Sequence, residues 1–352
     1  MKRLLSFPDV RDRIDWIGTP EQQRRMLRRF HLDGFEVVWC DQKVEERFAS
    51  EAVIGMHLPF YADWMNYWLE DFTRLDDEFG DRSTWTKFYQ GESKDAYIEY
   101  LRKALEYAHA LDVEYVVFHV SQVAVDEAYD YRFLFDDATV IAESVKLVNA
   151  LFDTNGRAGE KAVRGNPYKF KFLMENLWWP GLNFRDASLT KTLFDGIEYE
   201  QKGFALDLGH LLNADTSIRT SADAVAWIHH VLDVHEELLP HIRAVHLHQS
   251  MTGAFVEQFC ASGTRAYGKE NRSSLDYYDR FRLSYEHVAK IDEHAVWEIP
   301  GLQPILDRIK PDYLVYEFRA ETKEEYFLNL ERQNSYFGLT TGNSNKTPSH
   351  KS

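Results

Sequence analysis

Short apolar runs alternate with longer amphipathic stretches along almost the whole chain. Eight apolar runs of strand length occur at 4–9, 35–40, 53–60, 113–120, 168–177, 203–210, 242–249 and 312–318. Helical spacing of apolar residues appears between them, at 20–31, 94–111, 136–153, 221–238 and 322–336. This alternation predicts a parallel sheet covered by helices. Because the runs are apolar along nearly their whole length, they favour strands buried on both faces and closure into a (β/α)8 TIM barrel.

An open, doubly wound sheet is the alternative architecture. With 352 residues, the chain accommodates one barrel of about 250 residues with insertions. We therefore expect a single α/β domain over 1–340 and a disordered polar tail at 341–352. Two long insertions, 61–93 after the third strand and 250–291 after the seventh, are expected over the carboxyl-terminal face of the barrel, and the Gly- and charge-rich stretch 154–167 is predicted to be a loop.

Composition narrows the class of partner only weakly. The net charge of −16 disfavours a non-specific nucleic-acid coat, because such binding depends on clustered Lys and Arg. It leaves open a cleft in which bound metal ions supply the positive field. The two cysteines, Cys40 and Cys260, form no disulfide framework and suit a reducing compartment. No apolar run approaches the roughly 20 residues that span a bilayer, so we expect a cytoplasmic protein without a membrane segment.

Histidines and carboxylates recur at or just beyond the ends of the apolar runs. They are His57, His119, Glu175, Asp207, His210, His246, Asp292, His294 and Glu317. Imidazole and carboxylate groups are the ligands that hold zinc, manganese or iron in proteins. Burying such a group is costly unless it is paired or bound to metal. Because the carboxyl ends of barrel strands meet at one rim, the pattern predicts a site for several metal ions.

Each candidate also has a simpler interpretation. His57 or His119 alone is more often a hydrogen-bonded core histidine than a ligand. Asp207 and His210 stand three apart in DLGH, where Gly209 would permit a tight turn and both side chains could face one metal. The alternative is that Asp207 merely caps a following helix.

Two further segments leave alternatives open. Asp292 and His294 would lie on the same side of an extended segment, or else in a solvated loop. His248 follows His246 by two residues, so it is a rival for the ligand position or a hydrogen-bonding partner of a ligand.

Seven motifs, in order and spacing, resemble the endonuclease IV family. They are HLPFY, FHVS, MENLWW, LDLGH, VHLHQS, IDEHAVW and YEF. That family, also called AP endonuclease family 2, comprises abasic-site nucleases within the xylose-isomerase-like TIM barrel superfamily, and the resemblance extends over 4–335.

The resemblance implies divalent transition metals, two to three per chain, with zinc favoured over manganese or iron. It implies that Glu175 bridges two ions. His57 and His119 would share the first ion, Asp207, His246 and Glu317 would hold the second with Glu175, and His210, Asp292 and His294 would hold the third.

Some residues depart from the family pattern. Gln249 replaces an aspartate, and Leu177 and Trp178 replace small polar residues. The segment between His246 and Asp292 is longer than the family's connector. The early basic loop of the family is shortened here to DQKVEE, 41–46, in which only Gln42 and Lys43 could contact DNA. The metal site looks retained while the DNA-binding apparatus looks remodelled.

The favoured function is therefore metal-dependent hydrolysis of a phosphoester, with Glu175 as catalytic proton acceptor. The substrate would be abasic DNA or a small phosphorylated molecule. Trp64 and Trp178 would contact it, together with Arg265 and Lys269 of the 250–291 insertion.

A sugar isomerase or epimerase of the same superfamily is the alternative function. It would use one metal held by Glu175, Asp207, His246 and Glu317, with tryptophans such as Trp64 and Trp178 against the sugar ring. A barrel that keeps only a structural metal is a third interpretation, because fold does not decide function.

Overall fold

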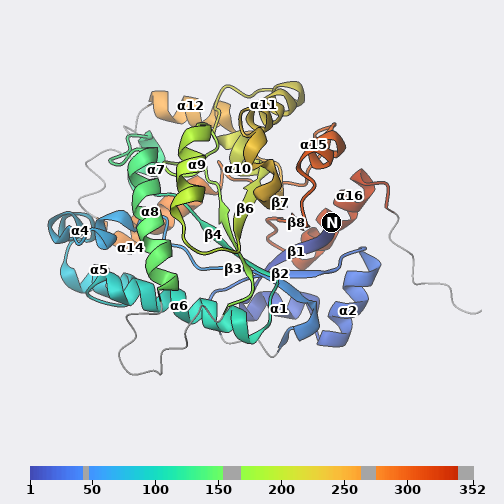
Figure 1. The fold of residues 1–352 in the computed structure, drawn as a ribbon, viewed down its shortest axis with the longest axis horizontal. Helices are drawn as coiled ribbons and strands as arrows, with labels where there is room; N and C mark the ends of the chain where they lie inside the picture. Colours follow the sequence, from blue (N-terminus) through green and yellow to red (C-terminus); the bar gives the residue numbers. More distant parts are fainter. Residues whose placement is uncertain (43–46, 154–167, 263–274, 340–352) are drawn as a thin grey trace, which may run out of the picture.

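Eight parallel strands close into a barrel in chain order. The computed structural model describes residues 1–42, 47–153, 168–262 and 275–339. The strands are β1 (Lys2–Pro8), β2 (Gly34–Val38), β3 (Val53–His57), β4 (Tyr115–His119), β5 (Lys171–Glu175), β6 (Lys202–Asp207), β7 (Ile242–Leu247) and β8 (Tyr313–Tyr316). Each pairs with the next, and β8 pairs with β1 (Figure 1). The predicted TIM barrel is confirmed, and the open sheet is excluded.

Helices follow the strands and surround the barrel (Figure 1). They are α1 (Arg11–Ile17), α2 (Pro20–Arg29), α3 (Met65–Trp68), α4 (Phe72–Phe79), α5 (Arg82–Phe88), α6 (Lys94–Ala110), α7 (Glu127–Asp130), α8 (Asp137–Phe152), α9 (Ala187–Gly196), α10 (Leu208–Asn213), α11 (Ser221–Val234), α12 (Gly253–Ser262), α14 (Tyr277–Val288), α15 (Leu302–Ile309) and α16 (Lys323–Tyr336). The described residues also form the 3-10 helices η2 (Ser50–Ala52) and η3 (Glu236–His241). None of these helices is both long and apolar enough to cross a bilayer.

Two helices, α2 and α11, begin at a reciprocal cap that the sequence supplies. At α2, the Thr19 hydroxyl accepts from the backbone N–H of Gln22, whose side chain accepts from the Thr19 N–H, and Pro20 follows at the first helical position. A second reciprocal pair, Thr220 and Asp223, opens α11. These contacts satisfy backbone donors that a helix start leaves unpaired, so local sequence fixes where each of these two helices begins.

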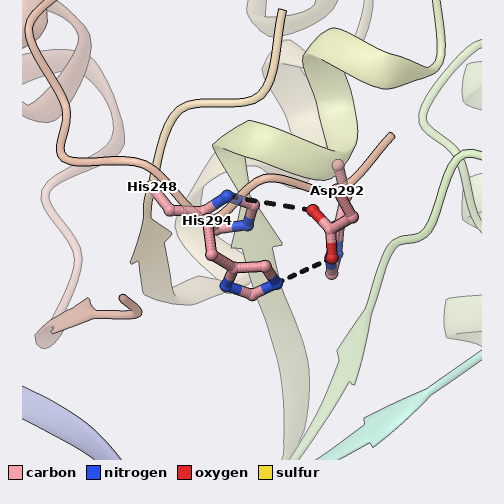
Figure 2. Close-up of side chains that lie close together, drawn as sticks. His248, Asp292 and His294 are labelled. Carbon is pink, nitrogen blue, oxygen red and sulfur yellow. Dashed lines mark hydrogen bonds and ion pairs between the residues drawn. The ribbon is translucent and has the colours of Figure 1, made fainter. Parts of the chain in front are cut away.

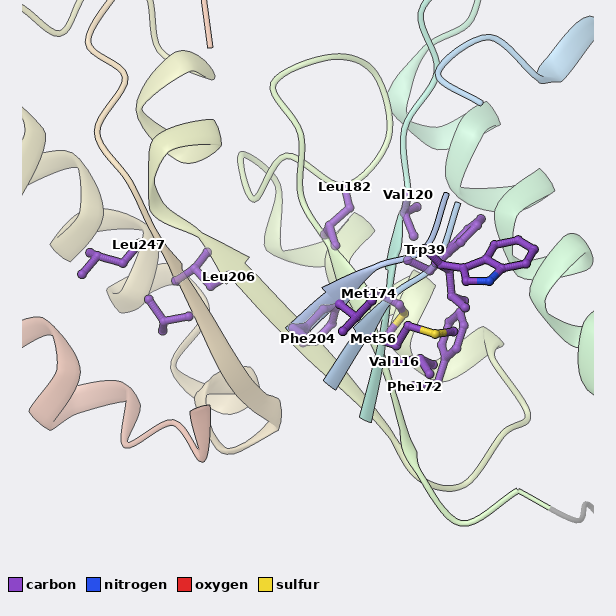
Figure 3. Packing of buried hydrophobic residues seen from close by; sticks show 14 of the residues in the cluster. Trp39, Met56, Val116, Val120, Phe172, Met174, Leu182, Phe204, Leu206 and Leu247 are labelled. Atoms are coloured by element: carbon purple, nitrogen blue, oxygen red, sulfur yellow. The ribbon is translucent and has the colours of Figure 1, made fainter. Parts of the chain in front are cut away.

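In every strand except β2, alternate side chains face two different hydrophobic clusters. The barrel interior holds Leu4, Ile54, Tyr115, Val117, Leu173, Ala205, Ala244, Tyr313 and Val315. Side chains on the opposite face pack toward the helices, among them Met56, Val116, Phe172, Met174, Phe204 and Leu206 (Figure 3). Both faces are therefore buried, which explains the nearly continuous apolar runs.

The insertions after β3 and β7 pack on each other. The first contains α3, α4 and α5, and the second contains α12 and α14. The rings of Phe79 in α4 and Tyr277 in α14 stack with their centroids 3.7 Å apart. The guanidinium of Arg280 also donates to the carbonyl of Glu78. The expected loop at 154–167, the expected tail at 341–352, and Lys43 lie outside the described residues.

Candidate metal centre

All nine predicted ligands gather at the carboxyl-terminal rim of the barrel. Four of them are the last residues of their strands: His57, His119, Glu175 and Asp207. His246 lies on β7 and Glu317 directly follows β8. His210 lies in α10, and Asp292 and His294 follow α14. Their ligand atoms form three groups, and within each group these atoms lie within 4.8 Å of one another.

The first group contains His57, His119 and Glu175. Both imidazole Nε2 atoms lie 3.0 Å from Oε2 of Glu175. The Nδ1 of His57 lies 2.8 Å from the Leu58 carbonyl, so Nδ1 carries the proton and Nε2 is free to bind a metal. Burial lowers the pKa of His119 to about 4 despite the charge of Glu175. At His57 burial also lowers the pKa, but Glu175 outweighs it and the net shift is upward.

The second group contains Glu175, Asp207, His246 and Glu317. The Nδ1 of His246 lies 2.9 Å from Oε1 of Glu175 and 3.3 Å from Oε1 of Glu317. Glu175 therefore presents Oε2 to the first group and Oε1 to the second. Burial raises its pKa, but the imidazoles of His246 and His119 outweigh this and hold the pKa well below its usual value.

Glu36 joins the second group from within the barrel, and the sequence interpretation missed it. Its side chain on β2 is 0% exposed. Its Oε2 lies 3.1 Å from Nε2 of His246 and accepts a 2.6 Å hydrogen bond from the Tyr115 hydroxyl. The available signal was an acidic residue inside the apolar run FEVVWC. A carboxylate behind a histidine fixes which ring nitrogen faces a metal.

The third group contains His210, Asp292 and His294, and His248 in addition. Asp292 Oδ2 lies 2.7 Å from Nε2 of His294 and 3.4 Å from Nε2 of His210. Figure 2 shows His248 and His294 facing opposite oxygens of Asp292. His246 and His248 are thus not alternatives for one position: each belongs to a different group.

The local backbone differs from the sequence expectation at two places. Asp207 does cap α10, because its Oδ1 accepts from the backbone N–H of His210 at 2.6 Å, and it belongs to the second group as well. The expected turn at Gly209 is wrong, since Gly209 lies inside α10. The expected extended segment is also wrong: His294 adopts φ +47°, yet its ring still meets Asp292.

The predicted substrate contacts have different outcomes. The ring of Trp178 lies 5.4 Å from that of His210 between centroids. Trp64 is 3% exposed and its indole N–H donates to the Ser121 carbonyl, which accounts for it as a core residue. Arg265 and Lys269 lie outside the described residues. A residue that the sequence interpretation did not single out, Phe60, is 43% exposed, and its ring centroid lies 4.1 Å from that of His119.

The charge balance of the site fits divalent metal ions. Burial lowers the pKa of His210 and His294, but nearby carboxylates outweigh it and raise these pKa values to about 10 and about 9. Burial raises the pKa of Asp292, but the imidazoles of His294 and His210 outweigh this and hold that pKa well below its usual value. Buried carboxylates at this density require positive charge, and a divalent cation held by the same nitrogen and oxygen atoms would supply it.

Solved structures of other proteins are similar to this chain over nearly its whole length. Endonuclease IV from Thermus thermophilus is 16% identical, with a TM-score of 0.50 over 96% of this chain and 99% of that one. The IOLI protein with a binding zinc atom is 12% identical, with a TM-score of 0.48 over 96% and 100%.

A D-tagatose 3-epimerase-like protein is 16% identical, with a TM-score of 0.45 over 96% and 100%. No curated protein sequence matches the chain. The family model described as xylose isomerase-like TIM barrel matches residues 25–294, and the chain belongs to that family.

Proposed function

We propose that this protein is a metal-dependent phosphoester hydrolase that holds three divalent ions at the barrel rim. The carrying observation is the position of Glu175, whose two oxygens face two different ligand groups while a third group adjoins them. An enzyme that needs a single catalytic ion would have no use for the first group beside the second. The imidazole-rich donor set favours zinc, with manganese or iron as alternatives.

Ions bound by these groups would supply a water of lowered pKa and would neutralise charge on a phosphoester. Glu175 would hold two of them and accept a proton from the attacking water. Because its pKa is held well below the usual value, the carboxylate is ionised at neutral pH, which is the state that a proton acceptor requires. Phe60 and Trp178 would form apolar walls beside the ions.

A sugar isomerase or epimerase remains the second candidate, on one specific observation. Glu175, Asp207, His246 and Glu317 form a complete and fully buried ligand group without help from the others. An isomerase of this kind would bind one ion tightly, so the number of ions separates the two candidates.

The test combines elemental analysis with a cleavage assay. Protein purified without chelator should contain two to three transition-metal ions per chain. It should cleave a duplex oligonucleotide that carries an abasic site or a small phosphodiester such as bis(p-nitrophenyl) phosphate. Chelator-treated protein and the Glu175→Gln variant are the controls. One ion per chain with no phosphodiester cleavage would reject the hydrolase in favour of the isomerase.

The two phosphorylated substrate classes separate by salt dependence. Cleavage of a long duplex that falls steeply between low and moderate salt would indicate contacts with several phosphates. The net charge of −16 favours the small phosphoester. Cleavage of the small diester without cleavage of the duplex at any salt would assign that class.

A further inference from the structure

We infer that His248 is a fourth protein ligand of the third ion, which closes that centre and gives it a structural rather than a substrate-binding role. The inference rests on the proposed three-ion site and specifies what one of its ions does. It concerns a residue beyond the nine ligands that the sequence pattern predicted.

The position of the imidazole supports a ligand role. His248 is 0% exposed, and one of its nitrogens lies within 4.8 Å of the ligand atoms of His210, Asp292 and His294. Its ring stacks on that of His294, with centroids 3.8 Å apart and an angle of 7° between the planes. Its Nδ1 lies 3.9 Å from Oδ1 of Asp292 (Figure 2).

The hydrogen bonds of His248 leave the correct nitrogen free. Its Nε2 lies 3.0 Å from Oδ2 of Asp207, and a carboxylate oxygen can only accept, so Nε2 carries the proton. The lone pair of Nδ1 then points toward the third group. The Ser250 hydroxyl lies 3.4 Å from this nitrogen but donates to Oδ1 of Asp292 at 3.3 Å, so it does not consume the lone pair.

The neighbouring helix makes room for this ring. An ideal Cβ built on Gly209 would lie 2.0 Å from Cε1 of His248 and 2.3 Å from its Nδ1. No side chain fits there unless the ring moves. Glycine at 209 is therefore explained by the close approach of His248 to α10.

The third centre differs from the other two because it shares none of its four protein ligands with another centre. Structural zinc sites are closed by four protein ligands, whereas catalytic ones keep a position open. The first group has three protein ligands, and the second has four, of which Glu175 is shared with the first, so those two ions would occupy one joint site. The third group shares no ligand with either, and the apolar side chains of Trp178 and Ile291 are buried near it.

The test isolates the third centre by removing a ligand from each of the other two. Glu175 belongs to both of those groups and not to the third. The Glu175→Ala variant, titrated with Co²⁺, should retain one tight ion with the intense visible absorption of a four-coordinate site. Adding inorganic phosphate should leave that spectrum unchanged. In the Glu175→Ala, His248→Ala double variant, affinity for the ion should fall more than about 100-fold, beyond the 10–100-fold range of a residue that only orients a ligand.

The control variant is His235→Ala, because His235 is also a buried histidine but contacts Thr190 outside the site. In the otherwise wild-type chain, His248→Ala should remove one ion from the total Co²⁺ content, and His235→Ala should remove none. Circular dichroism checks that each variant folds. If the double variant does not fold, the response of the Co²⁺ spectrum to phosphate in the Glu175→Ala variant still tests the inference.

Three results would overturn the inference. The first is a Co²⁺ spectrum of the third centre that shifts with phosphate in a chain that keeps His248. The second is an unchanged affinity for Co²⁺ in the Glu175→Ala, His248→Ala double variant. The third is loss of the second ion instead of the third in His248→Ala. None of these measurements involves turnover. A failure to hydrolyse phosphoesters would therefore reject the proposed function without touching this inference.

Discussion

Replacement of Gly209 by alanine tests the packing between α10 and His248 directly. The new methyl group would lie 2.0, 2.3 and 2.6 Å from Cε1, Nδ1 and Nε2 of the ring. The ring cannot withdraw freely, because Asp207 holds Nε2 and His294 stacks on its face. Overpacking of this kind costs about 1–3 kcal/mol, and we take the upper value because all three contacts are far below the usual van der Waals separation.

Two further contributions determine the expected loss in unfolding free energy of Gly209→Ala. Alanine is better than glycine inside a helix by about 1 kcal/mol, so the net loss in unfolding free energy of the metal-free protein is about 2 kcal/mol. If displacement of the ring also weakens binding of the third ion about 100-fold, the stabilisation that the metal provides falls by about a further 2.7 kcal/mol.

Urea unfolding, with chelator and then with Co²⁺ in excess, measures both quantities. The matched control is Gly196→Ala at the end of α9, where the atoms nearest the new methyl group are side-chain carbons of Val145, the closest at 3.0 Å, and it should be close to neutral. A Gly209→Ala protein as stable as this control, with undiminished stabilisation by Co²⁺, would refute the argument that the ring is held in place.

Three other outcomes are expected. Glu175→Gln should keep at least two ions by elemental analysis but lose phosphodiester turnover more than about tenfold, since the amide can bind metal but cannot accept a proton; activity closer to wild type than that would exclude Glu175 as the base. Glu36→Gln should weaken binding of the second ion about 10–100-fold in Co²⁺ titrations, because the carboxylate no longer fixes the His246 ring; unchanged affinity would contradict this. Burial and nearby Lys290 lower the pKa of His287 from 6.5 to about 4, so its neutral form stabilises the fold above pH 6.5 and that stability is lost as the pH falls toward 4. At about pH 5 this lowers the unfolding free energy by about 2 kcal/mol. In urea unfolding of the metal-free protein, wild type should therefore lose about 2 kcal/mol more unfolding free energy than His287→Phe between neutral pH and about pH 5; equal losses in the two proteins would contradict this.

The strands were predictable because burial on both faces requires a nearly continuous run of apolar residues in the sequence. β3 and β4 are buried at every position, so their apolar runs could not belong to a sheet with a solvated face. The positions of His57 and His119 followed from the same fact, since a polar residue that ends such a strand must lie at the rim. The helices of one or two turns, such as α3 and α7, gave too few residues for a periodic signal.

The rest of the site depended on geometry that one sequence does not carry. Glu36 lies in mid-strand, and whether it faces inward at the level of His246 depends on the tilt and stagger of the strands. His248 lies just past the end of β7, where the two-residue alternation no longer holds, so its ring reaches the third group and that of His246 the second. The left-handed backbone of His294 is set by tertiary contacts, because no local preference of histidine requires it.

The stacking of Phe79 on Tyr277 has a consequence for protein engineering. Because the insertions after β3 and β7 cover each other's aromatic surface, neither can be shortened or exchanged alone without exposing a face of the other to water. Chimeras with other barrels of the family would have to transfer both insertions together.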